Sequence, residues 1–220
     1  MGSTWRVLQL SDSGFPTGGF AHSGGLEAAV QLGEVRGPAE LRRFVRDLLW
    51  QTGQGALPLL SAAHREPTSL PALDARAEAF LSSHMANRAS RTQGRAFLDT
   101  CARIFPRPVT PVREAARAAG LCFHHAPVFG AVLHALDVSL EDAQQLFLSL
   151  TLRGALSAAV RLGIAGTHES HQLQHQATPL LDEVLAQCAG LGVEALAQPS
   201  PLLDLFGATH DRLYSRLFQS

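Results

Sequence analysis

The sequence lacks the features of a secreted or membrane-embedded protein. Its 220 residues contain three cysteines, Cys101, Cys122 and Cys188, and no CxxC pair. An odd number of widely spaced thiols argues against a disulfide scaffold and favours a reducing compartment. No apolar run approaches the roughly 18 residues of a membrane span, and the first residues show no signal-peptide layout. We therefore expect a cytoplasmic protein that does not enter a membrane.

Charged residues are also scarce. They make up 17% of the chain, against 46% hydrophobic residues, and the formal net charge is −1. The chain is too apolar to be disordered and too neutral to bind nucleic acid electrostatically. Its length suits a single domain spanning residues 1–220. The low charge has two explanations that stay open here, a large core or a surface buried against other subunits.

The motifs of common enzymes are missing. Gly19 and Gly24 have the spacing of a phosphate-binding loop, but Gly25 and Leu26 follow where lysine and a hydroxyl residue belong. No Ser-His-Asp, Cys-His or paired-carboxylate arrangement can be argued from spacing. We expect a protein that is not an enzyme, and a helical enzyme with an unrecognised site remains a rival.

Helical patterns dominate, and no stretch shows the strict two-residue alternation of a strand. One helix is predicted from Pro38, with apolar residues at helical spacing up to Gly53. A second is predicted from Pro71 to about Arg103, stopped by the Phe105–Pro108 run, and a short helix ending at Gly120 follows. The predicted fold class is all-α, a single multi-helix domain.

The helix with the clearest signals is predicted to begin at Ser139. Ser139 can cap it, with Asp142 in a capping-box-like position, and Gly163 can supply the left-handed exit. Gly154 lies inside this helix, where glycine costs roughly 1 kcal/mol relative to alanine. Close packing by a neighbouring backbone is the predicted reason for that glycine.

Residues 13–27 form a glycine-rich segment, in which Pro16 and several glycines predict a compact turn. His22 or Ser23 can then open a helix carrying Leu26 and Ala29. The segment is either a helix-entry turn in a core or a surface shaped for a partner.

Three histidines offer a candidate metal site. His168, His171 and His175 stand at positions i, i+3 and i+7, so they share one face if Thr167 caps a helix. Neutral imidazoles suit nickel or zinc, but exposed helix faces also accept histidine freely. A helical nickel-storage or nickel-sensing protein using this face is the alternative function. The pair His124-His125 points in two directions on a regular element, and His64, His84, His134 and His210 are isolated in the sequence.

The C-terminal residues are unusually apolar. Leu213, Tyr214, Leu217 and Phe218 fall within six positions, and chain ends fray unless something holds them. Each side chain gains about 1.5–3 kcal/mol when fully buried. They either fold onto their own core or are received by another subunit, as an amphipathic helix is received in a groove.

Several segments in order along the chain resemble the UreF family of urease accessory proteins. The run Leu8–Ser13 and the glycine-rich segment resemble the opening signature in the form of plant-like and some bacterial members. Segments around Arg88–Arg95, His125–Gly130 and Leu152–Gly163 resemble the family's middle, and Arg216–Ser220 resembles its ending. The matching motif residues are Pro16, Gly18, Gly19, His22, Ser23, Gly24, Leu26, Glu27, Arg88, Ser90, Gly94, Arg95, Arg153 and Gly154.

The resemblance implies an all-α protein that dimerises and binds a second accessory protein, UreD (also called UreH). It implies that this pair recruits the GTPase UreG and docks on apo-urease, where GTP-dependent steps deliver nickel. No cofactor is then bound stably, because the assembled complex handles the nickel. By motif, the surface for UreD/UreH carries over to Arg216, Leu217 and Phe218, with Leu213 and Tyr214 added from their spacing.

Overall fold

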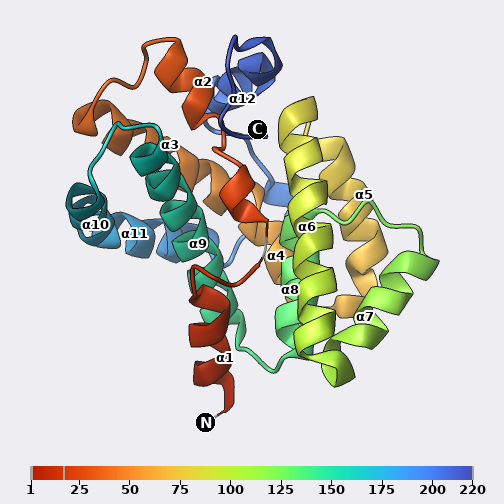
Figure 1. Cartoon of the computed structure of the whole chain (residues 1–220). Coiled ribbons are helices and arrows are strands. Elements are labelled where there is room, and N and C mark those ends of the chain that lie inside the picture. Colours follow the sequence, from red (N-terminus) through yellow and green to blue (C-terminus); the bar gives the residue numbers. More distant parts are fainter. Residues whose placement is uncertain (1, 17, 220) are drawn as a thin grey trace.

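The computed structural model describes residues 2–16 and 18–219 (Figure 1). Residues 1, 17 and 220, which belong to the predicted domain, glycine-rich segment and tail, lie outside the described residues. Within that part the chain is helical and contains no strand, so the predicted all-α class is confirmed. In chain order the helices are α1 (Gly2–Ser11), α2 (Leu26–Gln31), α3 (Pro38–Gly55), α4 (Leu57–Arg65), α5 (Leu70–Phe80), α6 (His84–Ile104), α7 (Pro106–Ala118), α8 (His125–Ala135), α9 (Leu140–Arg161), α10 (Thr167–Gln176), α11 (Thr178–Cys188) and α12 (Pro201–Thr209). Short 3-10 turns lie at Gly19–Ala21, Pro67–Ser69, Val193–Ala195 and His210–Arg212.

Helix α8 lies at the centre of the core because its sequence is apolar on every side. All residues from Ala126 to Leu133 are buried, as expected for a helix without a polar face. Gly130 lets α8 lie directly against α4, since a Cβ there would overlap the carbonyl oxygen of Leu60. Helix α6 flanks α8 on another side (Figure 1). Buried side chains from Leu10 to Phe218 join this core into one hydrophobic cluster.

The predicted helix from Pro71 to Arg103 is wrong in one respect, because the structure breaks it in two. Helix α5 ends at Phe80, and α6 begins at His84. Ser83 has extended backbone angles, and its hydroxyl accepts the N–H of Ala86 at 3.5 Å. This N-cap stabilises the start of a new helix, α6, so α5 does not continue through Ser83. The Phe105–Pro108 run ends α6 as predicted, but Pro106 also starts α7.

The helices predicted from Pro38 and from Ser139 are confirmed. The Ser139 hydroxyl accepts the N–H of Asp142 at 3.0 Å, and Gly163 has a φ of +72° at the exit of α9. The prediction for Gly154 is wrong, because no described residue outside the adjoining turns of α9 has an atom within 4 Å of where a Cβ would lie. Gly154 instead lines a cleft described below.

The two ends of the chain lie in different parts of the molecule (Figure 1). Helix α1 packs along α9, whereas the last residues lie beside α2 and α12. The N–H of Gln219 donates to the carbonyl of Ala21 at 2.8 Å, which ties the tail to the glycine-rich segment. No helix among the described residues combines the length and apolarity needed to cross a membrane.

Candidate functional site

The glycine-rich segment forms the predicted turn. Gly18, Gly24 and Gly25 have φ of +76°, +62° and +88°, which favour glycine. Gly25 also lies against α12, where a Cβ would come within 3.3 Å of the backbone of Gly207. The predicted helix opens three residues after Ser23, at Leu26.

The other motif residues of this segment contact the core or the cleft. The Pro16 carbonyl accepts from the hydroxyl of Thr100 at 2.9 Å, and Leu26 is fully buried. Gly19 begins a 3-10 turn. Burial lowers the pKa of His22, and the Arg88 charge lowers it further. Ser23 accepts the N–H of Glu27 at 3.4 Å.

Glu27 anchors the C-terminal tail. Its carboxylate is buried and lies 2.9 Å from Nε2 of His210. The same carboxylate accepts the backbone N–H of Leu217 at 2.6 Å and of Phe218 at 3.2 Å. A buried carboxylate is costly unless it is hydrogen-bonded. The three donors explain how Glu27 is kept in the core, and they make the tail part of the fold.

The apolar side chains of the tail differ in their burial: one is packed onto the chain's own core, and others are exposed. Phe218 is 5% exposed and belongs to the chain's own core, whereas Tyr214 is fully exposed and Leu217 is 53% exposed. Leu213 is half-buried, and Arg216 pairs with Asp211 at 3.2 Å. Phe218 is therefore held by its own chain, and the apolar atoms offered to water come from Tyr214 and Leu217.

Arg161 of α9 joins the tail to the glycine-rich segment. Its guanidinium lies 4.1 Å from the ring centre of Phe218 and 3.9 Å from that of Phe20. Gln31 of α2 donates to the carbonyl of Ser215 at 2.8 Å, which ties the tail to α2 as well. Phe20 is itself 70% exposed. We call Phe20, Tyr214 and Leu217 the terminal surface, because the contacts above hold the segments that carry them together.

A cleft of about 720 Å³ opens beside the terminal surface. Its walls come from the glycine-rich segment, α6, α9 and α12, and include Arg153, Gly154 and His125. Arg153 reaches the carbonyl of Ser11 at the end of α1. Burial lowers the pKa of His125 to about 4, so the imidazole is neutral at pH 7. Its ring lies against those of Phe97, Phe129 and Phe147, which suits an uncharged side chain.

The motif residues of the Arg88–Arg95 segment hold α6 against neighbouring parts of the chain. The hydroxyl of Ser90 accepts the N–H of His125 at 3.1 Å, and Gly94 lets α6 touch the backbone of residues 123–125. Arg95 lies over the ring of Phe123 at 4.6 Å. Arg88 contacts Asp211 at 3.4 Å and so reaches the segment before the tail.

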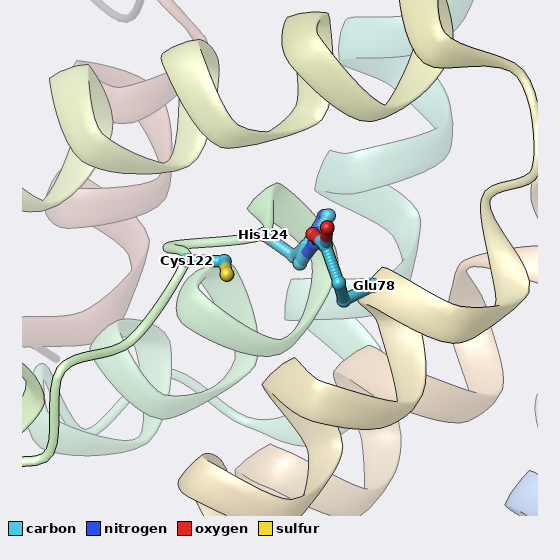
Figure 2. A group of neighbouring side chains, drawn as sticks. All are labelled: Glu78, Cys122 and His124. Atoms are coloured by element: carbon cyan, nitrogen blue, oxygen red, sulfur yellow. The ribbon is translucent and has the colours of Figure 1, made fainter.

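The sequence did not predict a second group of candidate site residues. Glu78 of α5 meets Cys122 and His124 of the loop before α8, and their donor atoms all lie within 4.8 Å of one another (Figure 2). His124 is fully buried, and its Nε2 lies 2.8 Å from a Glu78 oxygen. This hydrogen bond lowers the pKa of Glu78, whereas burial raises the pKa of the Cys122 thiol.

The three histidines of α10 do not form a comparable group. His168, His171 and His175 are all exposed, and Gly166 rather than Thr167 occupies the N-cap position. Among the described residues, the group of three or more potential metal-binding side chains that lie close together consists of Glu78, Cys122 and His124. Nickel binding by the α10 face stays a prediction.

The remaining histidines differ in their surroundings. His124 and His125 point into different environments, as predicted. The rings of His64 and His134 are in contact, with centroids 5.4 Å apart, so these two are isolated in sequence but not in space. His210 pairs with Glu27, and His84 pairs with Asp211 at 3.1 Å.

An all-helical chain whose distant segments combine into one surface with exposed apolar side chains has the features of a protein that assembles with other polypeptides. The sequence model of the UreF family matches residues 35–178. The chain belongs to the UreF family, so the resemblance seen in the sequence is confirmed.

Relatives from plants and bacteria cover nearly the whole chain. Urease accessory protein F of Oryza sativa subsp. japonica is 38% identical, over 98% of this chain and 85% of the relative. The protein of the same name from Arabidopsis thaliana is 37% identical, over 98% and 92%. Urease accessory protein UreF of Methylobacterium sp. (strain 4-46) is 30% identical, over 97% and 87%. The two plant relatives are more similar to this chain than this bacterial relative is.

Proposed function

We propose that the chain is a urease accessory protein that acts in the cytoplasm during urease maturation. It bridges a UreD/UreH-type protein and a UreG-type GTPase on apo-urease and regulates GTP-dependent nickel delivery. It makes no bonds itself, and the assembled complex handles the nickel. Membership of the UreF family supports this role, since the relatives are named accessory proteins.

The terminal surface is the observation that carries the UreD/UreH part of the proposal. Phe20, Tyr214 and Leu217 expose apolar atoms while the backbone beneath them is held by Glu27 and Ala21. A preformed surface loses little conformational freedom on binding, which favours affinity. Aromatic side chains in such surfaces often dominate binding energy.

A bridging protein needs more than one contact area, and α1 offers another. Trp5 and Leu8 are 74% and 54% exposed on this helix. Figure 1 places α1 at the opposite end of the molecule from the tail. We propose that this area serves a further subunit of the assembly, and that the protein works as a homodimer.

Co-purification with a tagged UreD/UreH-type protein tests the proposal. The double variant Tyr214→Ala, Leu217→Ala should bind about tenfold more weakly or worse, and urease activation by the complete set of accessory proteins should fall with it. Circular dichroism and Tm should match the wild type, because both side chains face water.

Two controls separate binding from folding. Ile104→Ala removes an exposed apolar side chain from the end of α6 and should leave co-purification unchanged. Phe218→Ala should destabilise the fold by about 3–5 kcal/mol, because it empties a buried site. Deleting residues 213–220 would combine both effects, so the double variant is the sharper test. A folded double variant that co-purifies as well as the wild type would overturn the proposal.

A further inference from the structure

Two acidic residues of α5 hold the loop before α8, and each does so in a different way. Asp74 is buried and accepts the backbone N–H groups of Cys122 at 2.5 Å and His124 at 2.7 Å. Glu78 lies one helical turn further on and therefore on the same face of α5. Asp74 thus fixes the backbone of the loop, and Glu78 faces the side chains that the loop presents.

The loop is shaped to present those side chains. Phe123, between Cys122 and His124, has a φ of +70°, a left-handed conformation that is rare outside glycine. The Arg95 guanidinium covers the Phe123 ring, and Gly94 lets α6 lie against the backbone. Phe123 is turned toward α6, and the donor atoms of the flanking Cys122 and His124 lie within 4.8 Å of each other and of Glu78. Figure 2 shows His124 directly against Glu78, with the Cys122 sulfur to one side.

We propose that Glu78, Cys122 and His124 bind a single divalent transition-metal ion of the zinc, nickel or cobalt kind. A thiolate, an imidazole and a carboxylate suit these borderline ions, whereas Mg²⁺ prefers oxygen donors alone. Metal bonds of about 2.0–2.3 Å place tetrahedral donors roughly 3.3–3.7 Å apart. The three donor atoms already lie within 4.8 Å of one another, so small side-chain rotations are sufficient. Three protein ligands leave the fourth position for water.

The hydrogen bonds of His124 support a ligand role. Its Nδ1 lies 3.1 Å from the Ser90 hydroxyl, and its Nε2 faces Glu78. In the metal-bound form Nε2 gives its lone pair to the ion, and Nδ1–H donates to Ser90, so the ring stays neutral. A histidine that binds a metal through one ring nitrogen usually donates a hydrogen bond from the other nitrogen to a neighbouring protein group. Cys122 loses its thiol proton to water as the sulfur–metal bond forms.

Groups on α6 compete with the ion for Glu78. Asn87 donates to one carboxylate oxygen at 3.2 Å, and Arg91 lies 3.9 Å from the other. The side chains of Arg91 and Glu78 are both exposed by more than a third, so their attraction is weakened by solvent. The site therefore opens toward water on this side, which gives an ion a way in.

Titration of the purified full-length chain with Co²⁺ tests the site without urease or any partner, so its outcome is independent of the proposed function. Binding of one Co²⁺ per chain should produce a thiolate-to-cobalt charge-transfer band. Zn²⁺ and Ni²⁺ should compete for the site, and Mg²⁺ should not. Cys122→Ser should abolish the band, and Glu78→Gln should weaken binding at least about tenfold while keeping a hydrogen-bond acceptor for His124.

Two further measurements keep the test decisive. The double variant His168→Ala, His171→Ala is the matched control and should bind Co²⁺ like the wild type. In the wild type, Zn²⁺ should protect the Cys122 thiol from alkylation, read out by peptide mass spectrometry, which needs no variant. Absence of the charge-transfer band in the wild type, or equal Co²⁺ affinity in a folded Cys122→Ser variant, would overturn the proposal.

Discussion

At the scale of single residues, Gly94 and Gly154 show how differently two glycines inside helices can be used. Both interrupt long helices at a cost of roughly 1 kcal/mol relative to alanine. A Cβ on Gly94 would overlap the carbonyl oxygen of Phe123 and approach the N of His125 at 2.9 Å. A Cβ on Gly154 would have no neighbour within 4 Å beyond its own helix, in the part of the chain that the structure describes. Gly94 is therefore required by packing, and Gly154 is not.

Alanine substitution should separate the two positions. Gly94→Ala should lower the free energy of unfolding by about 1–3 kcal/mol or more, because backbone must move to admit the methyl group. Gly154→Ala should raise it by up to about 1 kcal/mol, because the helix gains a better former. Urea unfolding measures both. A destabilised Gly154→Ala would show that this position has a close neighbour after all.

The missed residues also belong to this scale. Asp74 and Glu78 are four positions apart, which places them on one face of a helix but does not identify what that face contacts. Cys122 and His124 are two positions apart in a loop, a spacing that predicts no particular contact. Nothing in the sequence indicates that the pair on α5 and the pair in the loop lie next to each other in the fold. Likewise Glu27 was found as a motif residue, but its role required His210, which lies 183 positions away.

At the scale of elements, local capping signals predicted α9 better than periodicity predicted α5 and α6. Ser139 and Asp142 identified the start of α9 because a cap is a contact between neighbours in sequence. Apolar spacing continued across Phe80 and Leu81, so periodicity alone joined two helices. The pair Ser82-Ser83 was the available signal for a break, since Ser83 caps α6.

Removal of the α9 cap should have a defined cost. Ser139→Ala should lower the free energy of unfolding by about 1 kcal/mol, since the N–H of Asp142 loses its acceptor. Ser139→Asn keeps a capping side chain and serves as the matched control. Urea unfolding of both variants measures the difference, and equal stabilities would contradict a role for the hydroxyl.

At the scale of the whole molecule, the tail closes the fold by returning to the glycine-rich segment. Glu27→Gln should loosen it, because an amide replaces one of the two acceptor oxygens that hold His210, Leu217 and Phe218. We expect a loss of about 1–3 kcal/mol in the free energy of unfolding. Trypsin cleavage at the exposed Arg212 and Arg216 should become faster through local opening.

The exposed Glu34→Gln provides the control for this change in charge. Trypsin should cleave the Glu34→Gln variant at the wild-type rate, and its free energy of unfolding should equal that of the wild type. Unchanged cleavage in Glu27→Gln would mean that the core contacts of Phe218 alone hold the tail.

The sequence by itself determined the helical class, the start of α3, the cap and exit of α9, and membership of the UreF family. Each of these depends on residues close together along the chain, where spacing translates directly into geometry. Tertiary structure alone decided that Phe218 faces inward while Tyr214 and Leu217 face water, and that Glu78, Cys122 and His124 meet. Those outcomes depend on which helix faces pack together, and packing brings together residues whose separation in sequence carries no information about their distance in space.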